Sequence, residues 1–237
     1  VGTDGHTFQA VTSSGLVVMT VSIPTVPASI AAHTTATIDY QVTVHTNLDH
    51  GADDNLNLTL PIKVTDSDGS QSQGSTTITV TDSLDPELGL DKGVSLQEGG
   101  NQRIDGQLPV TVGSDRLVSL NFEASQPALA GLTSQGRPTS YEVQGNQLTV
   151  KDWQGNTILT VAIELDGKYS VALTGVFDEP EATNSLNFGL KVQGSDFDGD
   201  KSNLGTLNIT ITDGALPQVD PVSLTFTEDS NWQQEQT

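Results

Sequence analysis

The segment GSDFDGDKSN (194–203) places three carboxylates within five positions, at Asp196, Asp198 and Asp200, with Gly199 between the last two. Carboxylates this close repel one another, and an ionised carboxylate without a partner is costly wherever water is partly excluded. In an extended segment, residues two apart point the same way, so Asp196 and Asp198 can bind one hard cation. Gly199 permits the turn that brings Asp200 to the same ion. Ca²⁺ prefers oxygen ligands and takes about six to eight of them. The turn therefore predicts a calcium site completed by backbone carbonyls, water or an adjoining linker.

A shorter copy of this turn occurs earlier in the chain, in DSDGS (66–70), with Asp66, Asp68 and Gly69. Ser70 stands where the later copy has its third acid, so this site is predicted to be weaker. The alternative for both copies is an ordinary Asp-Gly hairpin turn with solvated carboxylates. Recurrence of the motif at matching positions in a very acidic chain favours calcium.

Composition limits the classes of function. Acidic residues outnumber basic ones 30 to 9 over 237 residues, which argues against binding to nucleic acid or to an anionic membrane surface. There is no cysteine, so neither disulfides nor thiolate metal sites can form. The apolar runs are too short for membrane insertion.

No nucleophile elbow, zinc-protease helix, P-loop or dinucleotide fingerprint is present, so the chain is predicted not to be an enzyme. The histidines, His50 among them, share no metal-ligand spacing and are predicted to lie on the surface.

Alternating apolar residues mark many short strands, as in TIDYQVTVH (37–45), LNLTLPIKV (56–64) and TLNITITD (206–213). Threonine, serine, valine and glycine are plentiful, and helical periodicity is almost absent. The sequence predicts an all-β protein: tandem Ig-like or Greek-key β-sandwich modules joined by short acidic linkers.

The chain repeats itself in a constant order. Residues 4–23 match 144–163, YQVTVHTNLD (40–49) matches YSVALTGVFD (169–178), and LNLTLPIKVTDSDGS (56–70) matches LNFGLKVQGSDFDGD (186–200). Finally, ITVTD (78–82) matches ITITD (209–213).

These matches predict four regions. Residues 1–82 are the back half of a module, either cut from an array or split by an inserted domain, and residues 83–89 are a linker. Residues 90–213 form a complete module with about fifty leading residues that the first lacks. Residues 214–237 are a linker and the first strand of a following module, because DPVSLTFTED (220–229) resembles DKGVSLQEGG (91–100).

Acids in and beside the linkers are a second predicted ligand set for calcium. Asp82, Asp85 and Glu98 are assigned to the first junction, and Asp213, Asp220 and Glu228 to the second. A cation shared between a turn and a linker would fix the angle between neighbouring modules, whereas unbound linker acids would leave the joint flexible.

Several ordered signatures resemble a known family. GSDRLVSLNF (113–122), LTSQGRPTSYEV (132–143), LDH (48–50), the two Asp-x-Asp-Gly turns and the closing ITITDG (209–214) are similar to the repeat modules of giant type I-secreted RTX adhesins. The chain departs from that pattern in an insertion at 24–38 and in lacking glycine-rich nonapeptide calcium repeats.

The resemblance implies a calcium-loaded extender on the extracellular surface of a bacterium, which spaces terminal binding domains from the cell for attachment and biofilm formation. Its partners would be neighbouring modules of the same chain. The alternative is a calcium-dependent site for a host or biofilm peptide or glycan within this region, using the insertion at 24–38 or an incompletely coordinated ion.

Overall fold

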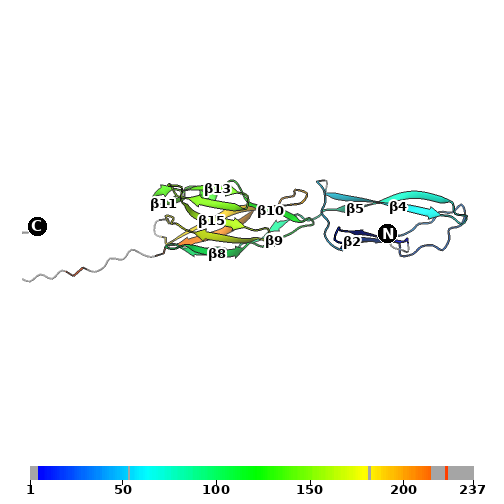
Figure 1. Cartoon of the computed structure of the whole chain (residues 1–237), viewed down its shortest axis with the longest axis horizontal. Helices are drawn as coiled ribbons and strands as arrows, with labels where there is room; N and C mark the ends of the chain where they lie inside the picture. Colours follow the sequence, from blue (N-terminus) through cyan, green and yellow to red (C-terminus); the bar gives the residue numbers. More distant parts are fainter. Residues whose placement is uncertain (1–4, 53, 181–182, 215–221, 224–237) are drawn as a thin grey trace, which may run out of the picture.

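The computed structural model describes residues 5–52, 54–180, 183–214 and 222–223, and within these ranges the chain is built from strands. They form two bodies that follow one another along the long axis of the molecule (Figure 1). We call residues 5–82 the N-terminal body and residues 87–214 the C-terminal body. One 3₁₀ turn, Pro127–Leu129, interrupts the strands. The predicted all-β class is confirmed. In the described ranges, no helix has the length and apolar character needed to cross a membrane.

The C-terminal body is a sandwich of two sheets that share one core. The first sheet has the order β10-β17-β18-β7, with strands β7 (Val94–Gln97), β10 (Leu117–Phe122), β17 (Ser185–Asp196) and β18 (Gly205–Thr212). The second has the order β13-β14-β15-β16-β8, with strands β8 (Gln102–Gln107), β13 (Ser140–Gln144), β14 (Gln147–Lys151), β15 (Thr157–Ile163) and β16 (Lys168–Leu173).

Alternation along the strands builds the core of this sandwich. Every second residue of β17 and β18 is buried, including Leu190, Leu207 and Ile211. The opposite sheet contributes residues such as Leu159 and Val171 to the same apolar cluster. Two small ribbons close the ends: β6 (Glu87–Leu88) pairs with β9 (Val110–Thr111), and β11 (Thr133–Ser134) pairs with β12 (Arg137–Pro138).

The N-terminal body has fewer strands around a smaller core. One sheet joins β1 (Thr7–Val11), β2 (Val17–Ser22) and β3 (Gln41–Val44), and a long hairpin joins β4 (Asn55–Thr65) to β5 (Gln71–Thr81). Its buried core consists of Met19, Val21 and Ile78. The insertion at 24–38 is exposed throughout and forms no strand.

The strand pairing of the two bodies shows the same correspondence as the sequence repeat. β1, β2 and β3 pair as β14, β15 and β16 do, and the β4–β5 hairpin corresponds to β17–β18. Register agrees residue for residue: Ile62 faces Gly74 across β4 and β5, as Val192 faces Gly205 across β17 and β18. In the part of the chain that the structure describes, β7, β8, β10 and β13 have no counterpart in the N-terminal body.

The missing counterparts predict a stability difference between matched positions. Leu190 is fully buried, whereas Leu60 at the same place in the repeat is only partly buried. We expect Leu190→Ala to destabilise the C-terminal body by about 2–5 kcal/mol and Leu60→Ala to cost the N-terminal body less. Calorimetric unfolding of the two variants measures these losses of stability. Equal losses would contradict the smaller and less covered core of the N-terminal body.

Candidate metal centre

The linker between the two bodies is held by close backbone contact. The Ser114 backbone N–H donates to the Leu84 carbonyl at 2.8 Å. A Cβ added to Gly113 would lie 1.9 Å from the same carbonyl oxygen, so this approach needs glycine. From the N-terminal body, the Asn47 side-chain amide donates to the Gly113 carbonyl at 3.0 Å. These contacts place the start of the linker against the loop that precedes β10.

The turn between β17 and β18 reaches the same junction. The Asp196 backbone N–H donates to the Asp200 carbonyl at 3.1 Å, which closes the turn, and Gly199 takes a φ of 108°. Only glycine adopts such a conformation readily. Asp196 pairs with Leu117 of the neighbouring strand β10, which buries its side chain. The turn is therefore the tight structure that the sequence predicted.

The N-terminal body contributes its own acid beside the linker. Asp54, just before β4, has a φ of 53°, and its carbonyl accepts a hydrogen bond from the Asp82 backbone N–H at 2.9 Å. Asp82 follows the last residue of β5, so this bond ties the two ends of the hairpin together. It also directs both acids towards the junction.

A buried pair joins the bodies directly. His50 and Asp115 are almost fully buried, and Asp115 accepts hydrogen bonds from the His50 backbone N–H and, at 3.1 Å, from the ring Nδ1. With Nδ1 donating, Nε2 is left as an acceptor, and it has no partner. Next to this pair, Arg116 forms an ion pair with Asp49 at 3.2 Å. The prediction that His50 lies on the surface is wrong, because the second body covers it.

These elements bring together six aspartates and one histidine in three overlapping groups, within each of which potential ligand atoms lie within 4.8 Å of one another. The groups are Asp82, Asp196 and Asp198; Asp54, Asp198 and Asp200; and His50, Asp82 and Asp115. Asp82 and Asp198 each belong to two groups. We call this set of seven residues the junction cluster.

Several carboxylate oxygens in the junction cluster are buried without a hydrogen bond. Both oxygens of Asp196, whose residue is 1% exposed, have no partner, nor do one oxygen of Asp82 and one of Asp198. Among the described residues, the ion pairs give these six aspartates no lysine or arginine. A buried carboxylate normally has such partners, so the negative charge of the cluster is not compensated by these side chains.

Burial and crowding raise the pKa of three aspartates of the cluster. Burial, and then the neighbouring Asp198, raise the pKa of Asp196 to about 6. Burial raises the pKa of Asp115, and burial followed by the charges of Asp198, Asp85, Asp54 and Asp82 raises that of Asp200. Asp82 is the exception, because a hydrogen bond with the Ser114 side chain lowers its pKa. The folded state thus holds several carboxylates where their charged form is disfavoured.

Chemically, the cluster can hold a hard divalent cation. The two groups built only from carboxylates, which share Asp198, supply the oxygen ligands that such ions prefer. A cation there would satisfy the unpartnered oxygens of Asp82, Asp196 and Asp198 and cancel their repulsion. The buried His50–Asp115 pair borders these groups and fixes the second body against the first.

The earlier copy of the turn is different. Asp66 and Asp68 are exposed at the far end of the β4–β5 hairpin, where the Ser70 backbone N–H donates to both carboxylates at 2.8 and 3.1 Å. Hydrogen bonds with Asp66 and then with Ser70 lower the pKa of Asp68. In the described part of the protein, neither residue belongs to a group of possible metal ligands. Here the solvated-turn alternative describes the observed geometry.

The other predicted linker acids lie in different places. Asp85 is exposed but close enough to raise the pKa of Asp200. Glu98 was assigned to the first junction, and this is corrected: its backbone N–H donates to Thr212, so it lies at the opposite end of the C-terminal body. Asp220 and Glu228 lie outside the described residues.

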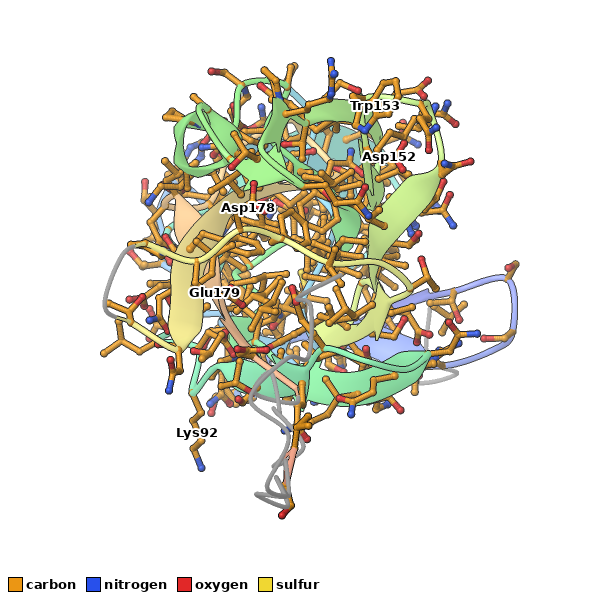
Figure 2. The ribbon with its side chains drawn as sticks, turned by 90° about the vertical axis from the view of Figure 1, so that its left-hand side faces the viewer. Lys92, Asp152, Trp153, Asp178 and Glu179 are labelled. Carbon is orange, nitrogen blue, oxygen red and sulfur yellow. The ribbon has the colours of Figure 1, made fainter. Side chains whose placement is uncertain are left out.

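Glu98 lies among other acids at that outer end. It accepts a hydrogen bond from the Phe177 backbone N–H at 2.6 Å, and burial, with Glu179, Asp213 and Asp178, raises its pKa. Figure 2 shows Asp178 and Glu179 on the segment that connects β16 to β17. These two residues occupy the repeat positions of Asp49 and His50, and Asp213 that of Asp82.

Three members of the cluster, Asp54, Asp115 and His50, were not predicted from the sequence. Two of them stand in segments that served only as marks of resemblance, LDH (48–50) and GSDRL (113–117). Their only signal was a histidine after an acid in one segment and an aspartate in a loop before a strand in the other. That signal has no periodicity or spacing that would link it to Asp196, which lies 81 residues after Asp115 and 146 residues after His50.

Comparison with known proteins adds little. No family model and no curated protein matches the chain. Among solved structures, the chain is similar to the crystal structure of domains 4 and 5 of the S-layer protein SbsC, with 14% identity and a TM-score of 0.23, over 87% of this chain and 89% of that one. The description of the fold therefore rests on the strands themselves.

The unpartnered charge of Asp196 generates a prediction for the metal-free protein. In chelator at pH 8, we expect Asp196→Asn to raise the melting temperature of the C-terminal body by roughly 3–5 °C, the shift that about 1 kcal/mol produces in a domain of this size. The reason is that the amide removes a buried negative charge from a cluster without cations. Exposed Asp105, changed to Asn, is the control and should leave the melting temperature unchanged. A lower melting temperature for Asp196→Asn would mean that the carboxylate is already satisfied.

Proposed function

We propose that this chain is a calcium-rigidified repeat region of a large extracellular bacterial adhesin, which spaces binding domains from the cell surface. The observation that carries the proposal is the position of the junction cluster. Its carboxylates come from the N-terminal body (Asp54), from the end of that body's last strand where the linker begins (Asp82) and from the C-terminal body (Asp196, Asp198 and Asp200). An ion bound by all three would act on the joint between the bodies.

The chemistry of the donor set favours Ca²⁺ over other common cations. Thiolates are absent from the sequence, and His50 supplies the only imidazole in the cluster. Zinc and other borderline metals favour nitrogen and sulfur donors, whereas calcium takes carboxylate oxygens in large and flexible shells. Carboxylates shared between adjacent groups, as Asp198 is, suit two ions that lie side by side.

A spacer function follows from what the ion would do to the joint. Without cations, the carboxylates of the two bodies and of the linker repel one another, and the joint is free to open. With cations, the same carboxylates become shared ligands, and the joint is fixed. The adhesin assignment rests on the resemblance of the repeat to RTX adhesin modules.

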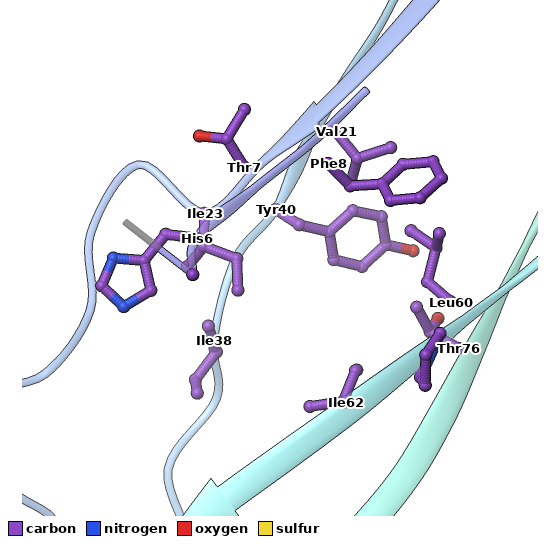
Figure 3. A pocket seen from close by; sticks show the side chains of 12 residues that line it. His6, Thr7, Phe8, Val21, Ile23, Ile38, Tyr40, Leu60, Ile62 and Thr76 are labelled. Atoms are coloured by element: carbon purple, nitrogen blue, oxygen red, sulfur yellow. The ribbon is translucent and has the colours of Figure 1, made fainter. Parts of the chain in front are cut away.

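The alternative function, binding of a peptide or glycan, draws on one feature. An apolar cavity opens in the N-terminal body between the β1–β2–β3 sheet and the β4–β5 hairpin. None of the residues that line it (Figure 3) belongs to the junction cluster.

Calcium should stabilise the protein measurably. At a calcium concentration ten times the dissociation constant, each site adds roughly 1.4 kcal/mol to the free energy of unfolding. We expect wild type to melt at a higher temperature in calcium than in chelator. Compared with wild type, Asp196→Asn should melt at a higher temperature in chelator and at a lower temperature in calcium. Asp68→Asn, at the solvated turn, should keep the calcium response of wild type. Identical melts of wild type in calcium and in chelator would refute the calcium proposal.

The shape of the protein tests the spacer function separately. We expect X-ray scattering to show one elongated particle in calcium and a broader distribution of shapes in chelator. Asp82→Asn combined with Asp198→Asn removes the two ligands that belong to two groups each, so this variant should remain in the broad distribution in calcium. Calcium binding without any change in scattering would leave a metal site but exclude its role as a hinge lock.

A further inference from the structure

The imidazole of His50 is held on one side and has an unpartnered nitrogen on the other. His50 lies between β3 and β4 and is 3% exposed. Its Nδ1 lies 3.1 Å from the Asp115 carboxylate, which also accepts a hydrogen bond from the His50 backbone N–H. Its Nε2 is buried and has no hydrogen-bond partner. A buried polar atom of this kind calls for a water molecule or an ion as its partner.

Asp82 has an unpartnered oxygen in the same group of residues. Its Oδ1 accepts hydrogen bonds from the backbone N–H groups of Ser83 and Leu84 at the start of the linker. Its Oδ2 is buried without a partner. Potential ligand atoms of His50, Asp82 and Asp115 lie within 4.8 Å of one another. One free nitrogen and one free oxygen therefore belong to a single buried group.

Both unpartnered atoms are acceptors, which restricts what can lie between them. With Nδ1 donating to Asp115, Nε2 presents a lone pair, and the Asp82 oxygen is an acceptor when ionised. One water molecule could donate to both atoms, but it would leave the charges of Asp82 and Asp115 uncompensated. Among the described residues, neither aspartate forms an ion pair with a lysine or an arginine. A divalent cation would satisfy both acceptors and also supply the positive charge.

The nitrogen donor determines the class of cation. Ca²⁺ and Mg²⁺ take oxygen ligands, whereas imidazole suits Zn²⁺, Cu²⁺ and Ni²⁺. A histidine that binds such an ion usually donates its other ring N–H to a carboxylate, which fixes the tautomer and the orientation of the ring. Asp115 occupies that place on His50. The two groups built only from carboxylates contain no nitrogen donor, so this preference is confined to the His50 end of the junction cluster.

We propose that His50 Nε2 and Asp82 Oδ2 bind a divalent transition-metal ion of the zinc class, with water completing its shell and Asp115 orienting the imidazole. This site is additional to the calcium proposed for the carboxylate groups and does not depend on it. Asp82 belongs to one of those groups as well, so its carboxylate would bridge the two ions when both are bound. His50 precedes β4, Asp82 follows β5, and Asp115 belongs to the C-terminal body. The ion would therefore hold the joint at a second point.

Calorimetric titration with Zn²⁺ in excess Ca²⁺ tests the site on the whole chain. We expect one Zn²⁺ to bind wild type, and His50→Gln to abolish this binding because it removes the nitrogen donor. Asp115→Asn should weaken it by about 10–100-fold, the usual effect of losing the group that orients a ligating imidazole. His33→Gln, which changes an exposed histidine, is the matched control and should bind like wild type. Zinc affinity that survives His50→Gln would overturn the proposal.

Nitrogen-15 NMR of the histidine rings provides a test on wild type, without any variant that could disturb docking of the bodies. The chain has four histidines, of which His50 alone is buried. We expect its ring to carry a proton on Nδ1 in the metal-free protein and stoichiometric Zn²⁺ to shift the resonance of Nε2. A His50 ring that Zn²⁺ leaves unchanged would overturn the proposal, as would a ring protonated at both nitrogens. A zinc shift in a protein whose melting ignores Ca²⁺ would support this site and refute only the calcium proposal.

Discussion

Electrostatic repulsion between carboxylates that share a small, partly dry volume is the constraint on which the junction depends. Six aspartates converge there, and both oxygens of Asp196 are buried without a partner. Bringing them together opposes folding and docking of the two bodies unless a cation or protons compensate. The pKa values of Asp196, Asp115 and Asp200 are raised for the same reason, because holding a proton removes the unfavourable negative charge. The contacts between the linker and the two bodies hold these carboxylates in place against that repulsion.

The other contacts of the junction supply that opposing force. The linker carbonyl of Leu84 packs onto Gly113, and Asn47 donates to the same loop. His50 is buried against Asp115, and Arg116 pairs with Asp49 while stacking on Phe197 at 4.2 Å. These contacts set the position of the second body before any ion is considered. The carboxylates oppose that position, and the proposed control of the hinge by cations would need both the holding contacts and this repulsion.

Sequence patterning was sufficient for the fold and for part of the site. Strict alternation predicted the strands and the all-β class, the Asp-x-Asp-Gly turn predicted Asp196, Asp198 and Asp200, and the acid at the start of the linker predicted Asp82, because these features are local. Glu98 was misplaced because it stands soon after the linker in sequence. The chain from Leu88, beside Gly205, to Gln97, paired with Thr212, runs along β18 and carries Glu98 to the far end. Asp54, Asp115 and His50 depend on docking between the bodies, and no local pattern records that contact. His50 in particular was predicted to be exposed, because nothing near it in the sequence indicates that it packs against Asp115, sixty-five residues later.

The two copies of the acidic turn separate what the motif does from what its surroundings do. Both are tight hairpin turns with glycine at a positive φ, 92° at Gly69 and 108° at Gly199. In the first copy, Ser70 satisfies both aspartates, and solvent covers them. In the second, β10 buries Asp196, while Asp82 arrives from the other body. The same turn is thus an ordinary solvated hairpin where nothing docks on it and a crowded, undercompensated cluster where another body does. The proposed cation site would therefore belong to the junction rather than to the motif, and under that proposal an array of such modules would create one site for each joint that forms.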